Sequence, residues 1–268
     1  MMVKQFLNPP NWFTSASLFC GLYAILLAGE AQGDPNAYYK AGLMIFFAGL
    51  FDMLDGRVAR MTGTGSAFGV QLDSLVDIIS FGVAPACLVY FWGLHVYGFA
   101  GVFISGMLML CGAFRLARFN VTQGDGKAHK FSQGLTITMG GGTVSSVVMW
   151  HAGSGLPIPE DPWSIAVLVM FIALLEVSDV PFRGMKTFKM SPRTMAAIVV
   201  FAGVCLAVGA VYDISTVLVI LGLAHVASGP IEAMVTWPRR RRAKRGSIEA
   251  ARVEQKPEDE ETRRGGHH

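Results

Sequence analysis

Long apolar runs follow one another along most of this 268-residue chain, and they limit its possible folds more than any other feature. Eight of them approach the ~20 residues that a helix needs to cross the hydrocarbon core of a bilayer. They lie at residues 11–29, 38–60, 67–92, 96–119, 133–153, 162–180, 193–211 and 213–236. Only 15% of the residues are charged, against ~25% in an ordinary soluble domain. The sequence therefore predicts an all-α integral membrane protein with about eight transmembrane helices.

Positive charges are concentrated in alternate connections between these segments. One set of connections contains Arg57, Arg60, Arg115 and Arg118, whereas the opposite set contains Lys40 as its only cation. Connections rich in lysine and arginine stay on the cytoplasmic side of a membrane. We therefore expect an even number of spans, with both termini and the ends of the second and third helices on the cytoplasmic side.

The composition changes after Trp237. The sequence PRRRRAKR follows the last apolar segment, and a mixed-charge, acidic stretch follows it. A basic cluster next to a membrane helix contacts anionic lipid and fixes orientation. We therefore expect a polytopic membrane domain at residues 1–236 and a disordered cytoplasmic tail at residues 237–268.

Four aspartates interrupt the apolar sequence near the cytoplasmic ends of the second and third predicted helices. Asp52 and Asp55 are three residues apart, and Asp73 and Asp77 are four residues apart. Each pair therefore lies on one face of its helix. The linking sequence MTGTGSAFG predicts a tight turn, which lets the two pairs face each other.

Four neighbouring carboxylates repel one another unless cations lie among them. Two nearby arginines can form buried ion pairs with them, but two negative charges then remain uncompensated. Carboxylates in membrane helices mark ion or substrate sites, and two-metal sites recur in phosphoryl chemistry. The stretch therefore predicts a divalent-metal site beside a phosphate-bearing ligand, with purely structural ion pairs as the alternative.

The spacing D-x2-D-G-x2-A-R-x8-G-x3-D-x3-D is met here at all eight fixed positions. These positions are Asp52, Asp55, Gly56, Ala59, Arg60, Gly69, Asp73 and Asp77. The pattern resembles the signature of the CDP-alcohol phosphotransferase family. That resemblance implies a membrane enzyme in which an alcohol attacks the phosphate of a CDP-linked donor and CMP is released.

The resemblance also implies roles for individual residues. Asp52, Asp55 and Asp73 would hold divalent ions, two Mg²⁺ or Mn²⁺ in each active site. Asp77 would be a further metal ligand or the base that takes the proton of the alcohol.

Residues around the donor are implied in the same way. Gly56, Ala59 and Gly69 would leave room for the cytidine, and Arg60 would face the phosphates. The sequence Pro10-Asn11-Trp12-Phe13-Thr14 resembles the family's Pro-Asn-x-x-Thr entry, which makes Asn11 and Thr14 nucleotide contacts. An ordinary capping role at a helix start is the alternative for these two residues.

Two further stretches resemble the phosphatidylserine synthase branch of the family. They are Ser74–Ala86 and the sequence RLARFN at Arg115–Asn120. The resemblance implies CDP-diacylglycerol and L-serine as substrates and a homodimer among membrane lipids. It also implies the cell (inner) membrane of a prokaryote, with the active site facing the cytoplasm. Arg115, Arg118 and Asn120 would bind the acceptor or the lipid phosphate, because guanidinium groups suit carboxylates and phosphates. The alternative is that the two arginines mark the membrane boundary and extend to lipid headgroups.

Other functions stay open from the sequence. A different acceptor or donor would make the chain an archaetidylserine, phosphatidylinositol-phosphate, phosphatidylglycerophosphate or phosphatidylcholine synthase. Intramembrane aspartates also occur in cation transporters, but here they cluster at one membrane edge together with arginine. We expect no nucleic acid partner.

Overall fold

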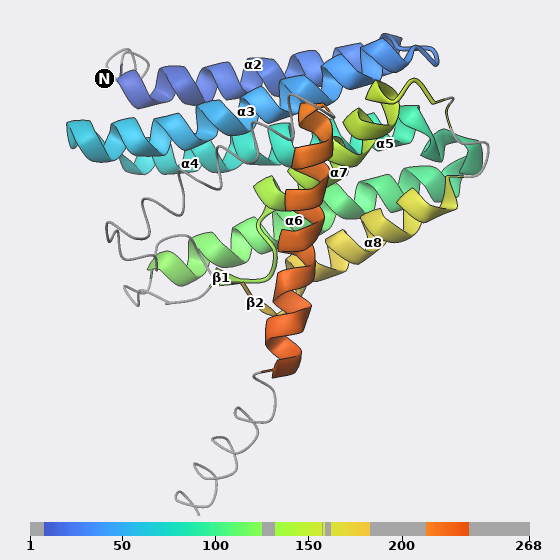
Figure 1. The fold of residues 1–268 in the computed structure, drawn as a ribbon. Coiled ribbons are helices and arrows are strands. Elements are labelled where there is room, and N and C mark those ends of the chain that lie inside the picture. Colours follow the sequence, from blue (N-terminus) through green and yellow to red (C-terminus); the bar gives the residue numbers. More distant parts are fainter. Residues whose placement is uncertain (1–7, 125–131, 157, 159–161, 183–212, 236–268) are drawn as a thin grey trace, which may run out of the picture.

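The fold is a bundle of long helices (Figure 1). The computed structural model describes residues 8–124, 132–156, 158, 162–182 and 213–235. Within these residues the regular elements are helices, apart from the two-residue strands β1 (Ser132–Gln133) and β2 (Pro181–Phe182), which pair antiparallel. The all-helical prediction is therefore confirmed in outline. The predicted segment 193–211 and the tail 237–268 lie outside the described residues.

The helices follow the predicted apolar segments closely. They are α2 (Pro9–Glu30), α3 (Pro35–Thr62), α4 (Ala67–Asp77), η1 (Ile78–Val83), α5 (Ala84–Trp92), η2 (Leu94–Tyr97), α6 (Phe99–Gly124), α7 (Ile137–Gly153), α8 (Trp163–Val177) and a last helix at Ile214–Val235. Four helical stretches are long and apolar enough to cross a membrane by length and composition, namely Pro9–Glu30, Ala67–Trp92, Phe99–Thr122 and Ile214–Val235. The membrane class is thereby supported, while the total of eight spans stays a prediction.

Local sequence explains how α3 ends and α4 begins. Gly63 adopts φ +64°, a left-handed conformation that glycine reaches without steric cost, and it ends α3. The Ser66 hydroxyl then accepts a hydrogen bond from the Gly69 amide at 3.0 Å and caps α4. The chain reverses within these few residues, as the tight-turn prediction requires. Two aspartate-bearing helix ends consequently lie side by side.

The predicted span 67–92 contains a π-helical segment, η1, that was not predicted from the sequence. In η1 the Ala84 amide bonds to the carbonyl of Ile79, five residues earlier. Pro85 follows directly and has no amide hydrogen to donate, so the ordinary helical ladder cannot continue through it. Segments of this kind are frequent at functional sites. Here η1 begins immediately after Asp77.

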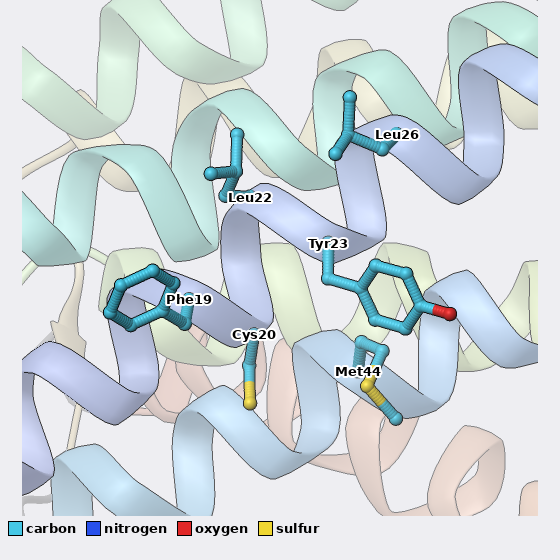
Figure 2. A pocket seen from close by; sticks show the side chains of 6 residues that line it. All are labelled: Phe19, Cys20, Leu22, Tyr23, Leu26 and Met44. Atoms are coloured by element: carbon cyan, nitrogen blue, oxygen red, sulfur yellow. The ribbon is translucent and has the colours of Figure 1, made fainter.

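The outer face of α2 is apolar and exposed. A hollow of about 440 Å³ lies between α2 and α3. Figure 2 shows the side chains that line it, namely Phe19, Cys20, Leu22, Tyr23, Leu26 and Met44. Phe19 is 69% exposed and Tyr23 is 54% exposed. Large contiguous apolar surfaces are rare on soluble monomers. This face therefore fits contact with lipid, in agreement with the predicted membrane location.

Close approach between α7 and η1 depends on Gly141. A Cβ at this position would overlap the carbonyl oxygen of Phe81 and lie 2.9 Å from Cγ of Pro85. We expect Gly141→Ala to destabilise the fold by about 1–3 kcal/mol, because backbone atoms must move apart. Gly142→Ala is the matched control, since no described atom lies within 4 Å of its added methyl group. Thermal unfolding in detergent should show a lower melting temperature for Gly141→Ala alone.

Candidate metal and substrate site

The structure brings the predicted aspartates of α3 and α4 together. Carboxylate oxygens of Asp52, Asp55 and Asp73 all lie within 4.8 Å of one another. The Asp52 carboxyl also lies close to those of Asp73 and Asp77. Asp55 is buried, and the other three are partly buried. Four acids thus share one small region where two helix ends meet.

This cluster fits a divalent cation. Mg²⁺ prefers oxygen ligands at about 2.0–2.1 Å, so two ligands of one octahedral ion lie roughly 3–4 Å apart. A set of carboxylate oxygens within 4.8 Å has the right chemistry and nearly the right spacing for one ion or for a bridged pair. Asp52, Asp55 and Asp73 are the residues that would hold it.

Helix α2 supports the cluster through Thr14. The Thr14 hydroxyl donates a hydrogen bond to Oδ2 of Asp55 at 2.7 Å, and both residues are buried. A hydrogen bond of this kind fixes the orientation of a metal-ligating carboxylate. Asn8 occupies the N-cap position of α2 but makes no capping hydrogen bond with its side chain, and Asn11 and Thr14 lie within the first turns of the helix.

Removal of this hydrogen bond gives a testable prediction. Thr14→Val keeps the shape of the side chain but cannot donate to Asp55. We expect it to raise the Mn²⁺ concentration needed for half-maximal activity by about 10–100-fold, the usual effect of losing an outer-shell partner. Ser15→Ala is the control, because the Ser15 hydroxyl donates its hydrogen bond to the Asn11 carbonyl of its own helix. Metal titrations of activity for both variants make the comparison.

A cavity of about 140 Å³ opens beside the acids, between α2, α3 and α4. Seven of the residues predicted from the sequence line it, namely Asn11, Thr14, Asp55, Gly56, Ala59, Gly69 and Asp73. A Cβ at Gly69 would lie 3.4 Å from Oδ1 of Asn11 and 3.3 Å from Oγ of Ser66, so any side chain there would narrow the cavity. Arg60 is exposed at the end of α3, where its Nη1 comes within 3.6 Å of a Cβ built at Gly56. Small residues therefore keep space open next to the carboxylates.

The predicted acceptor residues on α6 separate into different surroundings. Arg115 is 7% exposed, lies 5.5 Å from the ring centre of Phe119 and is within electrostatic range of Asp77. Asn120 donates a hydrogen bond to the Ser74 hydroxyl at 2.9 Å, one residue from Asp73. These two residues thus join α6 to the acidic helix.

Arg118 faces the end of α8 instead. It donates to the Ser178 carbonyl at 3.1 Å and the Val177 carbonyl at 3.3 Å, and it pairs with Asp179 at 3.2 Å. A guanidinium in this place satisfies terminal carbonyls and suits the negative end of the helix dipole. These contacts give Arg118 a structural role at the end of α8 that the sequence did not indicate.

Glu176 lies near the site and was not predicted from the sequence. It lies in α8, is fully buried and is within electrostatic range of Arg115. The available signal was a single acid within the apolar residues 163–177, because a carboxylate in a membrane helix usually has a function.

Comparison with known proteins defines the class. Residues 7–228 match the CDP-alcohol phosphatidyltransferase family, and the chain belongs to this family. The eight residues that match the family signature, at positions 52–77, lie within this matched range.

Individual relatives point to one branch. The chain is 35% identical over 167 residues to the CDP-diacylglycerol–serine O-phosphatidyltransferase of Helicobacter pylori, which covers 62% of this chain and 57% of that relative. It is 31% identical over 223 residues to the protein of the same name from Mycobacterium bovis, covering 81% and 76% of the two chains. It is also 36% identical over 187 residues to the archaetidylserine synthase of Methanothermobacter thermautotrophicus, covering 69% and 76%. The matched part thus spans little more than half of the Helicobacter protein.

Proposed function

We propose that this protein transfers the phosphatidyl group from CDP-diacylglycerol to the hydroxyl of L-serine, giving phosphatidylserine and CMP. The proposal rests mainly on one observation. Asp52, Asp55 and Asp73 of the family signature lie close together, beside a cavity whose lining includes Gly56, Ala59 and Gly69. Relatives named for the serine reaction support the choice of acceptor. Divalent ions, when bound, would offset the negative charge of the donor phosphates and polarise the phosphorus under attack.

In this mechanism the residues of the chain bind and orient the substrates, and one of them accepts a proton. Arg60 and Arg115 supply positive charge on either side of the acids, for the donor phosphates or the serine carboxylate. Asp77 accepts the proton of the serine hydroxyl. The serine oxygen forms a bond to the phosphorus that carries the diacylglycerol, and the bond from that phosphorus to the bridging oxygen of CMP breaks.

The arrangement in the membrane belongs to the same proposal. The distribution of arginine and lysine favours eight spans with both termini and the acidic cluster on the cytoplasmic side. CDP-linked donors are made from soluble nucleotides, which that side supplies. A homodimer is proposed from the family resemblance alone.

An ether-lipid donor is the second candidate, because one relative is an archaetidylserine synthase. The test is an assay of CMP release by purified protein in mixed micelles with Mn²⁺ or Mg²⁺. Serine, glycerol phosphate, inositol phosphate and choline are offered in turn with CDP-diacylglycerol, and serine is also offered with CDP-archaeol. We expect CMP release with serine and the diacyl donor. If serine gives no CMP with either donor, the proposal is wrong.

A further inference from the structure

A glutamate lies fully buried where α8 meets α6 and α7. Glu176 has no exposed surface, and neither of its carboxylate oxygens accepts a hydrogen bond from any residue in the described part of the chain. Two glycines make room for it. A Cβ at Gly140 would overlap Oε1, and a Cβ at Gly112 would lie 3.3 Å from Oε2.

Such a carboxylate is costly unless a positive charge compensates it. Burying an ionised group costs several kcal/mol, as an order of magnitude, when no partner is present. The cation that the described structure places within electrostatic range of Glu176 is Arg115, on the facing side of α6. Arg115 is itself 7% exposed, so it too needs negative charge nearby.

Arg115 is therefore within electrostatic range of two acids of different character. One is Asp77, whose carboxyl belongs to the aspartate cluster through its contact with Asp52. The other is Glu176, which lies outside the group of acids that can hold a metal. The carboxylate of Asp77 would also interact with any cation that the aspartate cluster binds. Glu176 is not part of that cluster, so its interaction with Arg115 does not depend on what the cluster binds.

We propose that Glu176 is a positioning residue for Arg115. Its negative charge holds the guanidinium buried beside the ring of Phe119 and turned toward the Asp77 side of the site. There Arg115 binds an anionic group of one substrate, either the donor phosphate or the serine carboxylate. This inference rests on the proposed function, since it assigns a task to Arg115 within that reaction.

The test uses the full-length protein and four variants, assayed for CMP release with serine and CDP-diacylglycerol. Glu176→Gln keeps the shape of the side chain and removes its charge, and Glu176→Asp keeps the charge on a shorter arm. Arg115→Gln and the double variant Arg115→Gln/Glu176→Gln complete a double-mutant cycle. Glu30→Gln, an exposed acid on α2, is the control for the same chemical change.

We expect Glu176→Gln to raise the KM for one substrate by about tenfold, a size usual for coupled neighbours, with little change in kcat. In the Arg115→Gln background the same change should alter KM less than about twofold, because the group it positions is gone. Glu176→Asp should be the more active of the two glutamate variants, and Glu30→Gln should equal the wild type.

Two results overturn the inference while leaving the proposed function standing. In the first, the wild type is active and Glu176→Gln is at least as active as Glu176→Asp, which is the order expected if the side chain only fills space. In the second, the Glu176 and Arg115 effects multiply independently in the cycle. A wild type that releases no CMP with serine overturns the proposed function itself.

Discussion

Asp77→Asn should lower serine-dependent CMP release by about 10²–10⁴-fold, the contribution usual for a general base. Asparagine has nearly the same size, so the partly buried position of the Asp77 side chain stays filled. The amide, however, cannot take the proton of the acceptor hydroxyl. We expect the fall to appear in kcat, with the melting temperature and the KM for the donor close to those of the wild type. Steady-state kinetics and thermal unfolding on one preparation measure both.

Two comparisons separate a base from other roles at this position. Asp179→Asn removes a carboxylate that is 86% exposed and pairs with Arg118, and it should leave kcat within a few-fold of the wild type. A titration of Asp77→Asn with Mn²⁺ gives the second comparison. If Asp77 only ligated metal, excess Mn²⁺ would restore much of the activity, and the assignment of the base would be wrong.

The sequence predicted the helices well, because apolar runs of transmembrane length leave few alternatives. The segment predicted at 67–92 is helical from Ala67 to Trp92, and the predicted turn before it lies between Thr62 and Ala67. These features depend on local chemistry, namely hydropathy, a left-handed Gly63 and a capping Ser66. The signature aspartates could be placed for the same reason, since their spacing and a short turn leave little freedom.

Contacts between distant helices could not be predicted in this way. Arg115 and Arg118 lie three residues apart in one sequence motif, yet Arg115 is within electrostatic range of Asp77 and Arg118 binds carbonyls at the end of α8. That difference depends on which part of α6 the C-terminal end of α8 contacts. A local sequence pattern does not predict this contact. The burial of Glu176 against two glycines depends on the packing of three helices in the same way.

Asp73→Asn should have the largest effect on the dependence of activity on metal. Asp73 lies within the set of carboxylate oxygens spaced by less than 4.8 Å and also lines the adjacent cavity. The loss of outer-shell partners costs about 10–100-fold in metal affinity, so the loss of a direct ligand should exceed about 100-fold. We expect the half-maximal Mn²⁺ concentration for CMP release to rise by at least that factor. Chelation with EDTA should abolish the activity of the wild type, and added Mn²⁺ should restore it.

The order of effects along this chain of contacts distinguishes a metal site from structural ion pairs. A metal site predicts that Asp73→Asn raises the Mn²⁺ requirement most, that Thr14→Val raises it less by releasing Asp55, and that Ser15→Ala leaves it unchanged. Structural acids predict a different result, because neutralising Asp73 would relieve its repulsion with Asp52 and Asp55 and raise the melting temperature with no change in metal dependence. A stabilised Asp73→Asn variant with wild-type metal response would therefore contradict the assignment of these aspartates as ligands.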